Sequence, residues 1–320
     1  MDERRLCRAQ RHREFHAAGQ GRAVGAGVWV DNPRTIPYPG PNQLFPCCAA
    51  ASGAPGGGEG EESVLDFVVF CIRVPKSGSS SLRQLLDAAF AGHRVFEVPK
   101  LTELDASLSR FQAWRLRRSQ RRVTRRLYGQ PDLARAIALI NREAKPGDLI
   151  DGGHFSYPEI QRLIHQPGRI ITLLRDPVAR AVSDYNYARE GYLRRLPWRR
   201  FDSGLSAKMA GRYSLEGYLD WLLEHADVYG NIASTFLGWD GAQPLAAFFA
   251  DHVFHAGVLE RKERFAAGLS EKMGKPLAFP WENKTGKREV SEVSAAVRQR
   301  IERLHARDFA LYAFTALHAG

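Results

Sequence analysis

A run of small polar residues around Lys76 is the part of this sequence best suited to chemistry. The residues Pro75-Lys-Ser-Gly-Ser-Ser-Ser81 separate the apolar run Leu65–Val74 from the segment Leu82–Phe90, whose apolar side chains recur at helical spacing. Consecutive small residues let backbone N–H groups converge on an anion, and the N-terminus of the following helix adds positive potential. The pattern therefore predicts a strand, a phosphate-binding loop and a helix.

The loop combines one full positive charge with several hydroxyl donors. The residues expected to contact phosphate groups are Lys76, Ser77, Gly78, Ser79, Ser80 and Ser81. Nucleotide kinases use the order GxxxxGK[ST], with the lysine after the glycines, whereas Lys76 precedes Gly78 here. A serine-rich loop that only caps the helix is the structural alternative, but seven small or polar residues exceed what a cap requires.

A second anion-binding pattern follows the apolar run Arg169–Leu174, which predicts another buried strand. This strand leads into Arg175, and Ser183 follows eight residues later on the next expected helix. A guanidinium binds phosphate oxygens in a bidentate manner, and a hydroxyl farther along the helix can complete the site. The alternative for Arg175 is a surface ion pair with Asp176.

The two motifs together resemble those of sulfotransferases that use 3′-phosphoadenosine 5′-phosphosulfate (PAPS). The sequence PKSGSSSL resembles their 5′-phosphosulfate loop. The resemblance implies that Arg175 and Ser183 bind the 3′-phosphate of PAPS and that Lys76 stabilises the leaving group. A later segment, 283–288, resembles the loop that covers the cofactor, which implies that Thr285 and Lys287 also contact it. The resemblance implies no metal.

Within this superfamily the sequence is most similar to the heparan sulfate and uronyl 2-O-sulfotransferases. Arg73-Val-Pro-Lys matches the start of their loop, and Asp151-Gly-Gly-His resembles their His-Gly-His segment. His154 falls on the second, catalytic histidine of that segment, while Gly152 replaces the first. The resemblance implies that Arg73 contacts the acceptor and that His154 is the catalytic base.

The chemistry of sulfuryl transfer agrees with these roles. A base must remove the proton of the acceptor hydroxyl, and a cation must stabilise the leaving phosphate. His154 is suited to be the base because an unperturbed histidine pKa of about 6.5 leaves it neutral near pH 7. Glu97 and Asp151 are rival bases, Glu97 is also a candidate acceptor-binding residue, and His154 could instead cap the following helix.

The segment between Arg110 and Arg126 contains eight arginines, in a chain with a formal net charge of +11. We expect Arg121 and Arg122 to bind an anionic carbohydrate, although a solvated helix face explains the same pattern. Nucleic acid is disfavoured as a partner because only two aromatic residues, Phe111 and Trp114, are interleaved with the arginines.

Alternating apolar runs and helical patterns predict an α/β fold: a central parallel sheet of about four or five strands, flanked by helices and P-loop-like. A long final helix is expected from Glu289 to about Leu317. Residues 1–62, which include a small-residue linker, are expected to be a poorly ordered N-terminal extension, and residues 63–320 a sulfotransferase domain.

The sequence as a whole therefore predicts an enzyme that sulfates a glycosaminoglycan-like acceptor. The alternatives are a nucleotide kinase and a protein of this fold that binds the nucleotide without turnover. No stretch is long and apolar enough for a membrane span. We expect a cytoplasmic enzyme, or one of the Golgi lumen or membrane if the N-terminus is incomplete.

Overall fold

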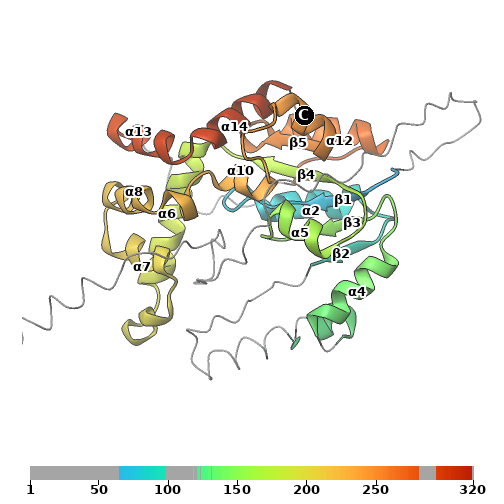
Figure 1. Cartoon of the computed structure of the whole chain (residues 1–320), viewed down its shortest axis with the longest axis horizontal. Coiled ribbons are helices and arrows are strands. Elements are labelled where there is room, and N and C mark those ends of the chain that lie inside the picture. The colour runs from blue at the N-terminus through green and yellow to red at the C-terminus, as the bar shows by residue number, and fades with distance from the viewer. Residues whose placement is uncertain are drawn as a thin grey trace, which may run out of the picture.

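Five parallel strands form a single sheet at the centre of the protein (Figure 1). The computed structural model describes residues 65–98, 118, 121–122, 124–130, 132–280 and 293–318. The strands are β1 (Val68–Cys71), β2 (Val95–Glu97), β3 (Leu149–Asp151), β4 (Gly168–Leu174) and β5 (Val253–Val258). They lie in the order β2-β3-β1-β4-β5, and every neighbouring pair is parallel. The predicted α/β fold with a central parallel sheet flanked by helices is confirmed.

Helices connect the strands and cover both faces of the sheet. Those that follow the first four strands are α2 (Ser79–Ala89), α4 (Leu133–Glu143), α5 (Tyr157–Leu163) and α6 (Pro177–Leu193). Next come η1 (Pro197–Asp202), α7 (Leu205–Arg212), α8 (Leu215–Glu224), α9 (Ala226–Tyr229), α10 (Ile232–Leu237) and α11 (Leu245–His252). The chain then forms η2 (Leu259–Arg261), α12 (Lys262–Met273), α13 (Ala295–Leu304) and α14 (Ala306–His318).

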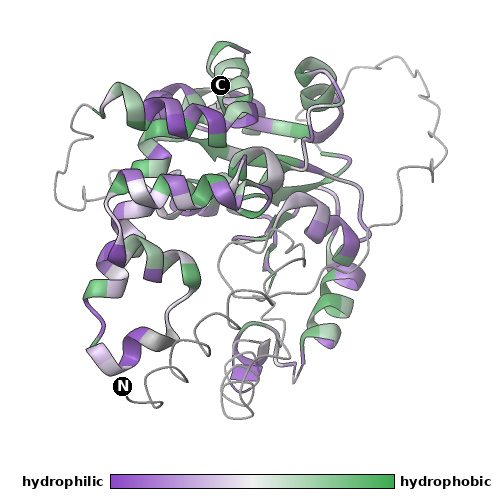
Figure 2. Ribbon diagram, turned by 60° about the vertical axis from the view of Figure 1, so that its left-hand side comes forward, coloured by the Kyte–Doolittle hydropathy of each residue, from purple (hydrophilic) through white to green (hydrophobic). Residues whose placement is uncertain are grey.

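Side chains of β1 alternate between two hydrophobic cores, as the period of a strand requires. Val69 and Cys71 pack with α2 and α12 on one face of the sheet. Val68 and Phe70 pack on the other face, in the core that includes residues of α5, α10 and α14. All four are at most 1% exposed, which is typical of a parallel strand covered on both faces. In Figure 2 the strands are accordingly among the most apolar ribbon segments.

The strand order places the connections after β1 and β4 on opposite sides. The chain leaves β1 towards β2 and β3, whereas it leaves β4 towards β5. Adjacent strands whose connections diverge leave a crevice at their carboxyl ends, and open α/β sheets bind ligands there. The phosphate loop follows β1 and Arg175 follows β4, so the two motifs that the sequence singled out meet at this crevice.

The C-terminal part differs from the sequence prediction, because the single long helix expected from Glu289 to Leu317 is two helices. The break is at His305, whose φ of −124° and ψ of 32° lie outside the helical range. The His305 Nδ1 accepts a hydrogen bond of 3.1 Å from the backbone N–H of Asn231, so a tertiary contact holds this residue. Residues 289–292 lie outside the described residues.

None of the helices within the described residues is long and apolar enough to cross a membrane. Across the same residues there is no group of three or more His, Cys, Asp or Glu side chains that could hold a metal ion. Cys71 is buried in the sheet as a free thiol.

Candidate active site

The phosphate loop between β1 and α2 has an unusual backbone. Lys76 and Gly78 adopt positive φ values of 66° and 78°, a left-handed conformation that costs a residue with a Cβ roughly 1–2 kcal/mol. A Cβ at Gly78 would also approach Leu259 Cδ1 to 2.9 Å. The loop therefore favours glycine at position 78 chiefly for its conformation, and it accepts strain at Lys76.

Polar groups of this loop are left without protein partners. Gly78 is the N-cap of α2, and no side chain caps the helix, so Ser79, Ser80 and Ser81 form an uncapped first turn. Ser77 is 2% exposed, and its Oγ has no hydrogen-bond partner among the described residues. An unpaired buried hydroxyl costs about 1–3 kcal/mol. An anion that accepts hydrogen bonds from Ser77 and the helix N-terminus would remove this cost, so the loop fits a phosphate or sulfate group.

Arg175 connects the second motif to the first. It follows the last residue of β4, and its guanidinium donates a hydrogen bond of 3.2 Å to the carbonyl oxygen of Lys76. Burial lowers the pKa of Arg175, which Glu260 and Asp176 oppose. Asp176 caps α6 by accepting from the backbone N–H of Ala179. Ser183 lies farther along α6 and is half-buried.

The ammonium group of Lys76 lies 3.9 Å from the ring centroid of Tyr187 on α6. Burial lowers the pKa of Lys76, while the nearby carboxylate of Asp184 raises it and Arg175 lowers it. Burial likewise raises the pKa of Asp184, against the effects of Arg180 and Lys76. A lysine that is only half-buried and packs on one aromatic ring can move towards a ligand at low cost.

His154 is exposed on the turn after β3, and its orientation is defined. Its Nδ1 lies 3.1 Å from the carbonyl oxygen of Arg73. A carbonyl oxygen can only accept, so Nδ1 carries the proton and the lone pair of the neutral ring is on Nε2. This tautomer gives the imidazole the electron pair that a general base requires.

The two rival bases, Asp151 and Glu97, form ion pairs with arginines. Asp151 is 4% exposed and contacts the Arg73 guanidinium at 3.1 Å and that of Arg83 at 3.2 Å. Arg83, from α2, also forms an ion pair with Glu97 at the end of β2. Both carboxylates are therefore already paired with arginine side chains. Arg73, predicted to contact the acceptor, is turned towards Asp151.

Gly152 replaces the first histidine of the resembling segment, and the packing around it leaves no room for a side chain. A Cβ on Gly152 would overlap Ile160 Cδ1 and approach the carbonyl oxygen of Cys71 to 3.3 Å. The backbone N–H of Gly152 donates to that same carbonyl at 3.1 Å. At Gly152 the chain that leaves β3 thus packs closely against both β1 and α5.

Other predicted site residues are not brought to this crevice by any described contact. Arg121 and Arg122 are helical and exposed. Thr285 and Lys287 lie outside the described residues, as does most of the arginine-rich segment.

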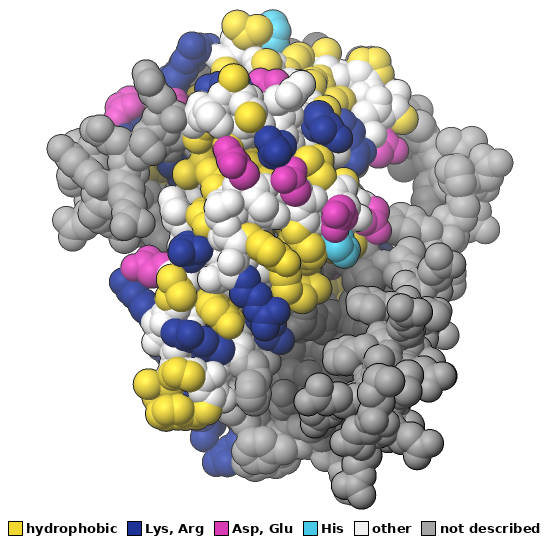
Figure 3. All heavy atoms as spheres, turned by 90° about the vertical axis from the view of Figure 1, so that its left-hand side faces the viewer, with side chains coloured by type: hydrophobic (Ala, Val, Ile, Leu, Met, Phe, Trp, Pro, Cys, Tyr) yellow, Lys and Arg dark blue, Asp and Glu magenta, His cyan; other side chains and the backbone are white. Residues whose placement is uncertain are grey.

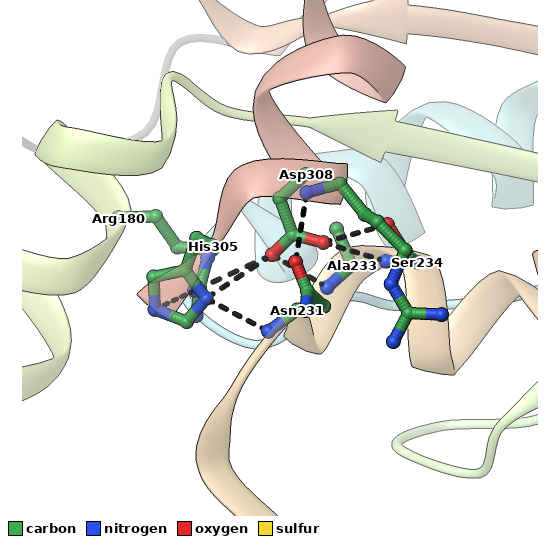
Figure 4. Close-up of polar contacts among 7 residues, drawn as sticks. Arg180, Asn231, Ala233, Ser234, His305 and Asp308 are labelled. Atoms are coloured by element: carbon green, nitrogen blue, oxygen red, sulfur yellow. Dashed lines mark hydrogen bonds and ion pairs between the residues drawn. The ribbon is translucent and has the colours of Figure 1, made fainter. Parts of the chain in front are cut away.

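Arg83 and a buried polar network that holds α6 had no part in the predictions from the sequence. This Asp308 network consists of Arg180, Asn231, Ser234, His305 and Asp308 (Figure 4). Asp308 is 2% exposed; it accepts bonds from the backbone N–H groups of Ala233 and Ser234 and from Ser234 Oγ, at 3.1, 2.9 and 2.8 Å.

Arg180, 4% exposed, lies 3.7 Å from the Asp308 carboxylate and 3.0 Å from His305 Nε2. Burial lowers the pKa of His305 well below its usual value, and Arg180 lowers it further. The network thus ties α6, and with it Arg175 and Ser183, to α10 and α14. Arg180 lies close to Arg175 in the sequence, but its partner His305 is 125 residues away, so local patterns give no sign of the contact.

Comparison with known proteins identifies a family for most of the sheet and its helices. Residues 68–250 match the sulfotransferase domain family. A crystal structure of the mouse sulfotransferase SULT7A1 complexed with PAP matches 76% of this chain and 66% of its own length, just under two thirds, with 16% sequence identity and a TM-score of 0.36. No curated protein matches the sequence. Because the family match covers more than half of the chain, from β1 to α11, this protein belongs to the sulfotransferase domain family.

Proposed function

We propose that this protein transfers the sulfuryl group of PAPS to a hydroxyl of a glycosaminoglycan-like carbohydrate. The observation that carries the proposal is the loop from Lys76 to Ser81, where the buried Ser77 hydroxyl and the uncapped start of α2 lack partners. The contact between Arg175 and the carbonyl of Lys76 supports a second anion site beside the first. Two adjacent anion sites suit a nucleotide with phosphate groups on both its 3′ and 5′ carbons.

In this proposal the 5′-phosphosulfate binds the loop, with Lys76 and the three serines Ser79–Ser81, and the 3′-phosphate binds Arg175 and Ser183. Thr285 and Lys287 remain candidates for covering the nucleotide. The acceptor oxygen forms a bond to sulfur while the bond between sulfur and the bridging oxygen breaks. The acceptor proton passes to His154 Nε2, and Lys76 neutralises the charge that develops on the leaving phosphate. No metal is proposed.

The acceptor side is proposed to resemble the uronyl 2-O branch. Support comes from the Arg73–Lys76 stretch and from the tautomer of His154, because the hydrogen bond to the Arg73 carbonyl leaves Nε2 able to take a proton. Arg73 and Glu97 would contact the acceptor from within their ion pairs with Asp151 and Arg83. Arg121 and Arg122 would bind its anionic groups farther away.

The test combines a binding and a transfer measurement. Titration calorimetry with the desulfated nucleotide PAP reports nucleotide binding, and transfer of radiolabelled sulfate from PAPS onto a panel of glycans reports turnover. We expect His154→Ala to lower turnover by roughly 10²–10⁴-fold while PAP affinity is unchanged, because a positioned base contributes about that much. His165→Ala, at an exposed histidine after α5, is the matched control.

If Glu97→Gln abolished transfer and His154→Ala did not, the base would be Glu97. A second candidate function is a nucleotide-binding protein without turnover. It is favoured by the absence of a histidine at position 152, where the packing leaves no room for one. That function would be shown by PAP binding with no transfer to any glycan. Absence of PAP binding would overturn both.

A further inference from the structure

Exposed apolar side chains gather on one projecting part of the protein, the α6–α7 arm, defined as Leu193–Tyr213. In Figure 1, α7 and the segment that leads to it extend away from the sheet. Nine large hydrophobic residues are exposed among the described residues, and five of them lie in this arm: Leu193, Leu196, Trp198, Leu205 and Tyr213. Trp198 is 66% exposed. Such clustering is unusual for a surface that contacts only water.

The arm is also strongly basic. It contains six Lys or Arg residues and one acidic residue, Asp202. Seven consecutive residues, from Leu193 to Arg199, are exposed, and they alternate apolar and cationic side chains in the order Leu-Arg-Arg-Leu-Pro-Trp-Arg. Figure 3 shows apolar and basic side chains next to each other on the lower part of this face.

Apolar side chains next to arginines fit some anionic partners better than others. Transfer of tryptophan and leucine side chains from water to the boundary between head groups and acyl chains is favourable, and arginines bind the lipid phosphates. A hydrated polysaccharide would satisfy the arginines but would leave Leu193 and Leu196 in water. A protein partner that covered the leucines would have to desolvate several neighbouring arginines as well.

We propose that the α6–α7 arm docks onto the surface of an anionic phospholipid bilayer. Leu193, Leu196 and Trp198 enter the interface, while Arg195 and Arg199 contact the head groups. The arm begins close to the candidate active site, because Tyr187, which contacts Lys76, precedes Leu193 by six residues, or about 9 Å along α6. Docking therefore holds the crevice near the bilayer surface.

Vesicle flotation of the full chain tests this proposal. We expect binding to phosphatidylcholine vesicles that contain phosphatidylserine and little binding to pure phosphatidylcholine. Arg195→Gln combined with Arg199→Gln should weaken the partition by about 25-fold, since each arginine near the surface contributes about fivefold. Leu196→Ser combined with Trp198→Ser should weaken it by about tenfold or more through lost apolar burial.

Matched controls lie elsewhere on the surface. Arg135→Gln with Arg142→Gln removes two exposed charges from α4, and Leu317→Ser removes the 69% exposed leucine of α14. These variants should bind vesicles like the wild type, and circular dichroism should show that all variants are folded. PAP binding should be unchanged in the arm variants, which separates this result from the proposed enzymatic function.

Three results would overturn the proposal. The first is equal vesicle binding by the arm variants and the controls. The second is loss of binding in the arginine variant without loss in the Leu196/Trp198 variant, because the apolar residues then stay outside the bilayer. The third is binding of soluble heparin through the arm with no binding to anionic vesicles, which would assign the arm to a polysaccharide.

Discussion

The phosphate loop and the Asp308 network differ in how far their buried polar groups are paired. In the loop, Ser77 Oγ has no partner among the described residues and Lys76 has a positive φ. In the network, the Asp308 carboxylate accepts three hydrogen bonds and faces Arg180, whose Nε is the network's buried atom without a hydrogen-bond partner among the described residues. An unpaired group is costly unless a ligand completes it, whereas a paired one stabilises the fold. The contrast supports the proposed binding role of the loop and a structural role of the network.

The largest expected effect is on the structural side of this comparison. Asp308→Ala leaves Arg180 as a buried charge without its carboxylate and removes the acceptor of three hydrogen bonds at the start of α10. We expect the free energy of unfolding to fall by about 3–5 kcal/mol, measured by urea denaturation. Asp227→Ala, at an exposed aspartate of α9, should change it by less than about 0.5 kcal/mol. If the two substitutions lowered the free energy of unfolding equally, the Asp308 network would have no special role in stability.

Lys76→Met is expected to have the opposite profile. Loss of the cation should reduce sulfate transfer by roughly 10²–10³-fold, as is typical when one group that stabilises developing charge is removed. The free energy of unfolding should be retained, because Lys76 is only half-buried and methionine can still pack on the Tyr187 ring. Lys145→Met, at an exposed lysine, is the control for both measurements. A Lys76 variant that transfers sulfate normally would show that the loop has no catalytic cation.

The third prediction concerns pH. Burial lowers the pKa of His255 to about 4, although its hydrogen bond to the Phe265 carbonyl opposes this. Between about pH 6.5 and 4 the unfolded chain therefore binds more protons than the folded protein. The stability that depends on neutral His255 is fully present above this window. As the pH falls across it, the free energy of unfolding decreases by about 3 kcal/mol. His305, in the Asp308 network, acts in the same direction.

Urea denaturation of the wild type and of His255→Gln, repeated between about pH 7 and 4.5, measures this dependence. The stability of the variant should fall less steeply on acidification. Parallel curves for the two proteins would show that His255 is not held neutral by the fold.

Much of the fold followed from local patterns. The apolar run Leu65–Val74 contains β1, and Arg169–Leu174 covers β4 except for its first residue, Gly168. The polar residues after these runs lead into α2 and α6. The order of strands and helices indicated a parallel sheet, because crossover connections are long. The final helix was predicted as one piece because nothing in the local sequence marks the break at His305, which a contact with Asn231 holds.

The sequence by itself determined the chemistry available: a loop with Lys76, an arginine after a second strand, and a histidine after a third. Only the tertiary structure decided how these groups are used. Arg83 binds both Glu97 and Asp151, and the Arg73 carbonyl orients His154. Backbone propensity and periodicity act over a few residues and can be read from the chain, whereas ion pairs and tautomers depend on neighbours that only folding brings together.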